Sequence, residues 1–218
     1  MLSYNSRMIS TQKKWLDYSL PVMEKMRKEL AAADAVVLAA GSGAPFQKSG
    51  EGQGEFSLDY FDESYIISYP QFQARLAATG KECPPGLLFL FLHYFHTADG
   101  TPAADRWIGY RELPDGMFYS QAFQGYSGAR LVNTFGNDLP RLNEAASKAG
   151  GEELSHGDAG FMFRGLPRVR LAVVYWLGDE EFAPNANVLF DASAGHYLST
   201  DGLAVLGREL CSKIIRQA

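Results

Sequence analysis

Residues 169–177 read VRLAVVYWL, a run rich in β-branched and aromatic side chains that is framed by Pro167 and Gly178. A short apolar run between turn residues is typical of a strand that is buried on both faces of a sheet. We therefore expect a central strand here. Residues 161–164 come just before it and are expected to pair with it as a β-hairpin.

Further strands and helices are predicted on both sides of this run. Residues 55–69 alternate apolar and polar side chains around Asp62 and Glu63, which predicts a hairpin, and residues 106–113 predict another strand. Apolar spacing and proline positions predict helices over residues 10–33, 87–97, within 117–149, and over 202–216, the last with Thr200 or Asp201 as its cap. Strands in adjacent runs predict an α+β fold with a mainly antiparallel sheet and helices at the N-terminus, in the middle and at the C-terminus.

No linker divides the chain, so a single domain over residues 1–218 is expected. Its parts would be an N-terminal helical segment (1–40), a mobile loop (41–54) and an α+β core (55–218). The loop prediction rests on five glycines between Gly41 and Gly54 and on the lack of a periodic apolar pattern there.

The composition excludes several classes of protein. The 218 residues carry a net charge of −5 without a block of like charges, so nucleic acid is not expected as a partner. No apolar stretch approaches the roughly 18 residues of a membrane span, and the N-terminus lacks a secretory signal. Cys83 and Cys211 are too far apart in sequence to form a metal-binding cysteine pair. A cytoplasmic protein is expected.

Several short segments follow one another in a characteristic order between residues 88 and 207. They are Leu92-His93-Tyr94, residues 98–102, Trp107, residues 110–114 with Gly116 and Tyr119, residues 134–136, residues 178–182, residues 189–191, residues 196–198, and Thr200-Asp201. In this order and spacing the chain resembles domain of unknown function family 3786, a group of uncharacterised proteins from anaerobic bacteria and archaea.

The resemblance implies a cytoplasmic protein of anaerobic metabolism. Some members of the family carry an additional iron–sulfur domain of the kind found in corrinoid-handling proteins, which implies a redox or corrinoid protein as a partner. This chain departs from those members because it lacks the cysteines that such a cluster requires.

Residues 178–201 concentrate carboxylates around one histidine. His196, Asp191 and Asp201 are the candidate catalytic residues, and Glu181, Asp191 and His196 are candidate metal ligands, because carboxylates and imidazole serve both as acid–base groups and as ligands. The structural alternative is that Asp191 begins an Asx turn, that Asp201 caps the last helix and that residues 179–181 form an exposed turn. His93, on the apolar helix at 87–97, is a further candidate metal ligand. The alternative is that His93 is a buried histidine of the core.

Tyr110, Arg111, Glu112 and Tyr119 are candidate ligand-binding residues around a proline-glycine turn. Arginine can hold an anionic group and tyrosines can stack on a planar one. Alternation along a strand would place Arg111 and Glu112 on opposite faces. The alternative is an internal ion pair that stabilises the turn.

Three functions are consistent with these residues. The first is an accessory protein that binds a small cofactor or metal-associated ligand in a cleft between residues 110–119 and 191–201. The second is a metal-dependent or acid–base enzyme that uses His196 and nearby carboxylates. The third is a protein-interaction module that uses aromatic residues within 118–135.

Overall fold

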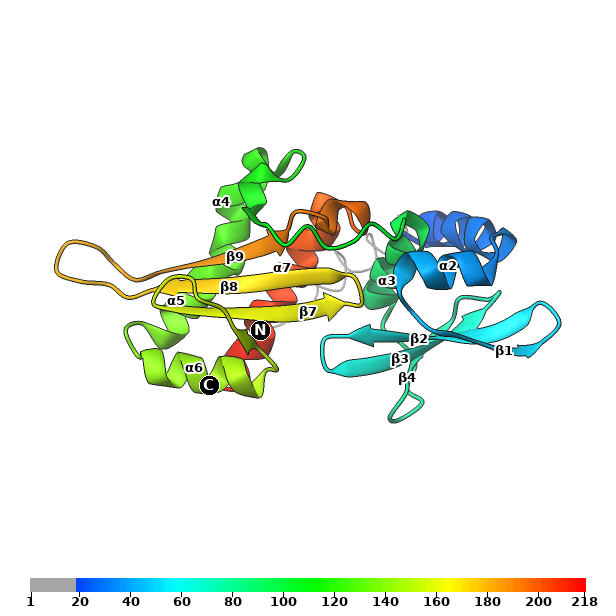
Figure 1. Ribbon diagram of the computed structural model, residues 1–218, viewed down its shortest axis with the longest axis horizontal. Helices are drawn as coiled ribbons and strands as arrows, with labels where there is room; N and C mark the ends of the chain where they lie inside the picture. The colour runs from blue at the N-terminus through cyan, green and yellow to red at the C-terminus, as the bar shows by residue number, and fades with distance from the viewer. Residues whose placement is uncertain (1–18) are drawn as a thin grey trace, which may run out of the picture. The chain divides into compact units, whose positions relative to one another are not determined.

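The computed structural model describes residues 19–218, which group into two compact units (Figure 1). The first unit comprises the described residues up to Leu58 together with Tyr65–Ala98, and the second comprises Asp59–Ser64 together with Asp99–Ala218. The single domain predicted from the sequence stays a prediction.

The first unit combines helices with a four-stranded antiparallel sheet. Residues 19–32 are helical, which confirms part of the helix predicted over 10–33; the rest of that prediction lies outside the described residues. The other elements are α2 (Ala35–Ser42), β1 (Phe46–Gly50), β2 (Gln53–Tyr60), β3 (Glu63–Tyr69), β4 (Ala74–Leu76) and α3 (Pro85–Thr97), with the strands in the order β1-β2-β3-β4. The predicted hairpin over 55–69 and the helix over 87–97 are confirmed.

Aromatic rings join α3 to this sheet. Strand β2 alternates strictly between exposed and buried residues, and its Phe56 is fully buried. The ring of Phe56 lies 4.9 Å from that of Phe95 on α3, and Tyr65 on β3 lies 5.1 Å from Phe91. The apolar face that alternation predicts is therefore the face that α3 covers.

Residues 41–54, for which the sequence predicts a mobile loop, contain the end of α2, strand β1 and the start of β2. Their glycines have defined positions: Gly43 ends α2 at a φ of 71°, and Gly52 occupies the turn between β1 and β2 at a φ of 64°. A side chain at Gly54 would collide with the Phe46 ring, 2.3 Å from the Cβ position. The turns and the close packing explain why glycine stands at these positions.

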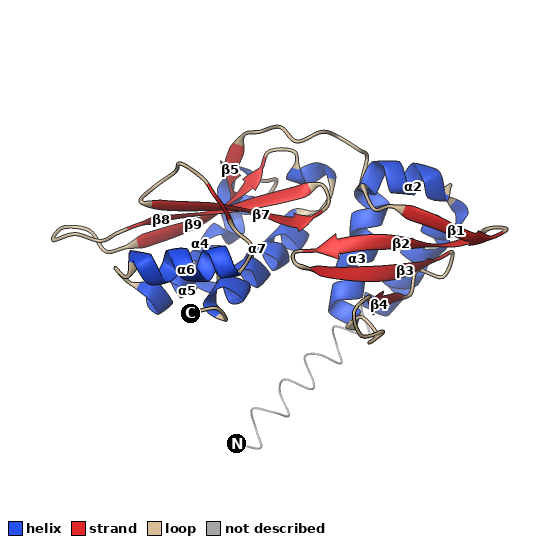
Figure 2. Ribbon diagram, turned by 60° about the horizontal axis from the view of Figure 1, so that its bottom comes forward, coloured by secondary structure: helices blue, strands red, loops and turns tan. Residues whose placement is uncertain are grey.

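The second unit contains a five-stranded antiparallel sheet and a group of helices. Its strands are β5 (Trp107–Gly109), β6 (Glu152–Glu153), β7 (Ala159–Leu166), β8 (Val169–Trp176) and β9 (Asn185–Asp191), in the order β5-β9-β8-β7-β6. Its helices are α4 (Gly116–Tyr126), α5 (Gly128–Phe135), α6 (Leu139–Lys148) and α7 (Thr200–Ile215), with short 3-10 turns η1 (Tyr110–Glu112) and η2 (Ala194–His196). Helices α4 to α7 lie against one face of the sheet (Figure 2).

Strand β8 is the centre of this sheet, as the run at 169–177 predicts. Successive residues from Leu171 to Tyr175 are all buried, so both faces of the strand are covered. Phe161 on β7 pairs with Val173, and Val188 on β9 pairs with the same residue from the other side. The α+β class and the antiparallel arrangement are confirmed.

The tip of the β2–β3 hairpin belongs to the second unit. The backbone N–H of Phe61 donates to the carbonyl of Gly165 at 3.0 Å. The ammonium group of Lys213 on α7, which is almost fully buried, forms an ion pair with Asp62. A buried lysine requires such a partner.

No helix in the described part of the chain is both long and apolar enough to span a membrane.

Gly128, the first residue of α5, brings this helix against β9. A Cβ atom at Gly128 would lie 2.0 Å from the carbonyl oxygen of Ala186, which is part of the sheet backbone and cannot move freely. The side-chain amide of Gln124 donates to the same oxygen at 2.8 Å.

We predict that Gly128→Ala lowers the free energy of unfolding by about 1–3 kcal/mol, because the added methyl group forces helix and strand apart. Gly125→Ala is the matched control: its Cβ would meet nothing within 4 Å. That substitution, within α4, should raise stability by up to about 1 kcal/mol. Urea unfolding measures both, and equal stability of the two variants would contradict the packing described.

Candidate functional site

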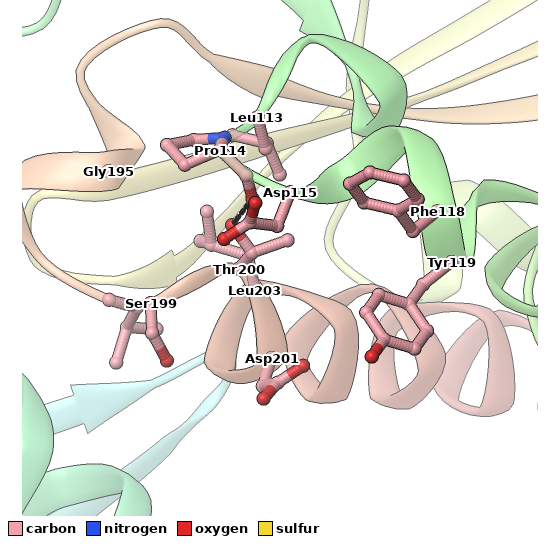
Figure 3. A pocket seen from close by; sticks show the side chains of 11 residues that line it. Leu113, Pro114, Asp115, Phe118, Tyr119, Gly195, Ser199, Thr200, Asp201 and Leu203 are labelled. Carbon is pink, nitrogen blue, oxygen red and sulfur yellow. Dashed lines mark hydrogen bonds between the residues drawn. The ribbon is translucent and has the colours of Figure 1, made fainter.

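A pocket of about 560 Å³ lies in the second unit between two segments that are far apart in sequence (Figure 3). One segment supplies Leu113–Asp115 with Phe118 and Tyr119; the other supplies Gly195, Leu198–Asp201 and Leu203. The two segments correspond closely to the two stretches between which the sequence predicts a cleft. Whether the pocket binds a ligand stays a prediction.

Local structure at each segment explains how the pocket forms. A Cβ at Gly116 would lie 1.9 Å from the carbonyl oxygen of Tyr110, so only glycine allows the chain to turn into α4 this closely. The hydroxyl of Thr200 donates to the carbonyl of Pro114 at 2.7 Å and joins the two segments directly (Figure 3). Ser199 caps α7 by accepting from the N–H of Gly202, whereas the sequence predicts Thr200 or Asp201 as the cap.

The lining combines uncovered aromatic rings with carboxylates. The side chains of Phe118 and Tyr119 are 82% and 59% exposed. Asp115 and Asp201 are exposed, and neither carboxylate has a hydrogen bond or an ion pair with any described residue. The lining contains no lysine, arginine or histidine.

Tyr110 lies close to this lining. Tyr110 is buried and stacks on Phe123 with ring centres 4.2 Å apart. Burial raises the pKa of Tyr110 to about 12, with further contributions from Tyr126, Asp201 and Tyr119. The phenol of Tyr110 therefore stays neutral at ordinary pH and can act as a hydrogen-bond donor.

The structure separates the four predicted ligand-binding residues. Tyr119 lines the pocket, and Tyr110 lies close enough to Asp201 for that carboxylate to raise the pKa of the Tyr110 phenol. Neither Arg111 nor Glu112 is part of the lining. The strand predicted over 106–113 is wrong beyond Gly109: the carboxylate of Glu112 accepts from the N–H of Gly109 at 2.7 Å and closes a turn. Arg111 and Glu112 are consequently both exposed, and they do not alternate across a sheet.

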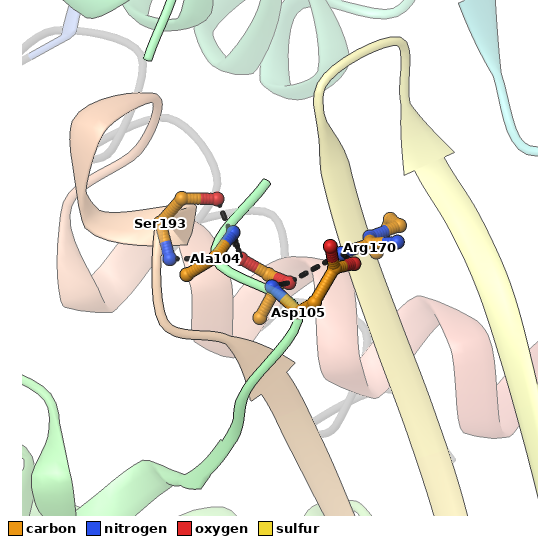
Figure 4. A network of polar contacts seen from close by, with 5 residues as sticks. Ala104, Asp105, Arg170 and Ser193 are labelled. Atoms are coloured by element: carbon orange, nitrogen blue, oxygen red, sulfur yellow. Dashed lines mark hydrogen bonds and ion pairs between the residues drawn. The ribbon is translucent and has the colours of Figure 1, made fainter. Parts of the chain in front are cut away.

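Asp191 is the centre of a polar network at the end of β9 (Figure 4). Its carboxylate is almost fully buried and accepts five hydrogen bonds. The donors are the N–H groups of Ala104 (2.9 Å), Asp105 (3.0 Å) and Ser193 (3.0 Å), the Ser193 hydroxyl (2.6 Å) and the Arg170 guanidinium (2.6 Å). The predicted Asx turn at Asp191 is present in the bond from the N–H of Ser193.

These bonds determine the charge of Asp191. Burial alone would raise the pKa of the carboxyl group, but the bonds from Ser193, Ala104 and Arg170 outweigh burial and lower that pKa to about 2. With its oxygen atoms committed to five donors, Asp191 has no capacity left for a metal ion or for accepting a proton from a substrate. Its role in this arrangement is structural.

His196 pairs with a residue that the sequence did not single out. Its Nδ1 atom lies 2.7 Å from the carboxylate of Asp99, and both side chains are about half exposed. The N–H and the hydroxyl of Thr101, followed by His196, lower the pKa of Asp99 to about 2. Asp99 therefore remains ionised and orients the imidazole through Nδ1.

The remaining candidates lie apart. Asp201 is in the first turn of α7, where the helix dipole stabilises a carboxylate. Glu181 is exposed in the loop between β8 and β9. His93 belongs to the first unit; it is half-buried, and burial lowers its pKa. Within residues 19–218, no group of three or more His, Cys, Asp or Glu side chains is arranged to hold a metal ion.

The aromatic residues predicted to offer an interaction surface within 118–135 are divided between surface and core. Phe123 and Phe135 are buried, and the exposed large apolar side chains within residues 117–135 are at the start of α4. A signal for Phe118 exists in the sequence, since Met117-Phe118-Tyr119 follows an Asp-Gly turn. The pairing of Asp99 with His196 has no comparable local signal, because 97 positions separate the two residues.

We predict that Asp191→Asn lowers the free energy of unfolding at pH 7 by about 2–4 kcal/mol, because it leaves Arg170 without its buried partner. Asp105→Asn is the matched control, since Asp105 contacts the same guanidinium at 2.5 Å but is 78% exposed. Its loss should be less than about 1 kcal/mol.

The pH dependence provides a second measurement on the same variants. The folded-state pKa of Asp191 is about 2, below the ordinary value of 3.8, so its stabilisation is complete above pH 3.8 and disappears as the pH falls toward 2. The difference between wild type and Asp191→Asn in denaturant unfolding should shrink over this range. A constant difference would show that the charge of Asp191 does not stabilise the fold.

Comparisons with known proteins give one match. No curated protein and no solved structure matches the chain. A family model described as Domain of unknown function (DUF3786) matches residues 34–213, which includes the pocket, the Asp191 network and most of both units. The chain belongs to the DUF3786 family.

Proposed function

We propose that this protein binds a small organic ligand in the pocket between residues 113–119 and 195–203, and acts as an accessory protein in anaerobic metabolism. The observation that carries the proposal is the uncovered aromatic lining: Phe118 is 82% exposed beside a pocket of about 560 Å³. Ligand sites are typically concave and have volumes of roughly 300–1,000 Å³, and this pocket has a volume in that range.

The chemistry of the lining favours an organic molecule over a metal-centred cofactor. Haem iron is held by His, Cys, Met or Tyr side chains, and of these the lining supplies only Tyr119. Asp115 and Asp201 are the only His, Cys, Asp or Glu side chains of the lining, and a zinc site takes at least three such protein ligands. A redox or corrinoid protein as partner rests on the family resemblance alone, and the cytoplasm as location rests on that resemblance and on the composition.

Filling the pocket tests the proposal. Gly195 lines the pocket and a Cβ there meets nothing within 4 Å, so Gly195→Trp should occupy the space without disturbing the fold. Gly125→Trp is the control, because Gly125 is equally unobstructed and is not part of the lining.

Binding is measured by ligand-observed NMR with a panel of small aromatic and aliphatic metabolites, flavin mononucleotide, haem and cobalamin. We expect at least one compound to bind the wild type and Gly125→Trp, and to lose at least about tenfold in affinity with Gly195→Trp, which corresponds to about 1.4 kcal/mol. If no compound binds, or if Gly195→Trp binds as well as the wild type, the proposal fails.

The pair of His196 and Asp99 favours acid–base catalysis as a second candidate function. Asp99 holds Nδ1 of His196 at 2.7 Å, which leaves Nε2 without a partner among the described residues. His196 also follows Gly195, a residue of the pocket lining. A carboxylate that orients an imidazole in this way is the arrangement of a general base. Asp99 thereby replaces Asp191, Asp201 and Glu181, which the sequence suggested as partners of His196.

For any ligand that the panel identifies, product formation followed by NMR decides between binding and catalysis. His196→Gln should reduce turnover by about 10²–10⁴-fold while leaving the affinity within a few-fold. His156→Gln is the control for loss of an exposed histidine. Turnover that survives in His196→Gln would exclude this histidine as the base.

A further inference from the structure

The charges that line the pocket all have one sign. Asp115 and Asp201 contribute carboxylates, and neither has an ionic partner among residues 19–218. Arg208, whose charge acts on Tyr126, is paired with Glu209 at 3.1 Å and is not part of the lining. A ligand in this pocket therefore meets a negative potential.

The starts of α4 and α7 are the lining features that would favour an anion. Helix N-termini attract negative groups because their first N–H groups are unpaired. At α7 the Ser199 hydroxyl already accepts from the N–H of Gly202, and Asp201 supplies a fixed negative charge in the same turn. An added anion would face Asp201 and Asp115 without a basic side chain to offset them.

The aromatic rings complement the carboxylates. Phe118 and Tyr119 come from α4, and Asp201 comes from the first turn of α7 (Figure 3). Aromatic faces attract cations through the ring quadrupole, and a carboxylate beside them supplies the counter-charge. Tyr110, whose phenol stays neutral, adds a hydrogen-bonding group near Asp201 rather than another negative charge.

We infer that the ligand of this pocket is an organic cation, either a protonated amine or a quaternary ammonium group, joined to a hydrophobic part that packs on Phe118 and Tyr119. The inference rests on the proposed function and specifies the class of ligand. It reverses the expectation of an anionic ligand held by Arg111, because Arg111 lies outside the lining.

Compounds matched in size and different in charge test the inference on the full chain. The probes are 2-phenylethylamine and benzyltrimethylammonium as cations, 2-phenylethanol as the neutral compound and 3-phenylpropionate as the anion. Isothermal titration or protein-observed NMR at pH 7 gives each Kd. We expect the cations to bind about five- to tenfold more tightly than the neutral compound, and the anion to bind more weakly than both.

Three variants test whether the pocket carboxylates cause the preference for cations. Asp201→Asn and Asp115→Asn should each weaken binding of the cations by about three- to tenfold and leave the affinity for 2-phenylethanol unchanged. Glu180→Gln is the control, because it removes one exposed negative charge in the loop between β8 and β9, outside the lining.

The outcomes separate the two proposals. If the neutral compound or the anion binds best and Gly195→Trp abolishes that binding, the pocket is a ligand site but the inference of a cation is overturned. Cation binding that Glu180→Gln weakens as much as Asp201→Asn does would reflect the net charge of the protein and would also overturn the inference. If no probe binds and the metabolite panel shows no effect of Gly195→Trp, the proposed function itself fails.

Discussion

The buried carboxylate of Asp191 holds together segments on which the second unit and its pocket depend. It joins Arg170 on β8, the backbone of residues 104 and 105, and Ser193 just before η2. Residues 104–105 lead into β5 and the turn that begins α4, whereas Ser193 leads to the start of α7. Each of the two segments that line the pocket therefore follows, along the chain, residues that are hydrogen-bonded to Asp191. A buried charge tolerates little displacement, because each lost bond leaves an unsatisfied polar group.

The parts of this structure that the sequence predicts are those determined by local pattern. Strand β8 is apolar on both faces because it lies in the middle of its sheet, so residues 169–177 predict it directly. Strand β2 follows the period of two that one covered face requires. Residues 41–54 gave no such signal, since Gly54 is determined by the Phe46 ring on the neighbouring strand and not by its own neighbours in sequence.

The candidate site was predictable only as two stretches of sequence. Their meeting depends on the bond from Thr200 to Pro114, which spans 86 positions, and on the turn that Glu112 closes onto Gly109. Asp191 and Arg170 are both conspicuous in the sequence, but their pairing follows from strand register. The prediction of Asp191 as a catalytic residue and that of Arg111 as a ligand-binding residue rest on residue type alone. Burial and hydrogen-bond geometry assign Asp191 to the framework and leave Tyr119 and Asp201 at the pocket.

The tip of the β2–β3 hairpin has a consequence for the order in which the chain folds. Asp62 comes early in the chain and its partner Lys213 lies near the C-terminus, with Tyr65–Ala98 of the first unit and nearly all of the second unit between them. Loop closure over such a separation is entropically costly and tends to be late in folding. During synthesis the second unit cannot complete its contacts until α7 has emerged. A fragment that begins at Asp99 would leave the Lys213 ammonium group without its carboxylate, so the boundary between the units is not a place where the chain can be divided cleanly.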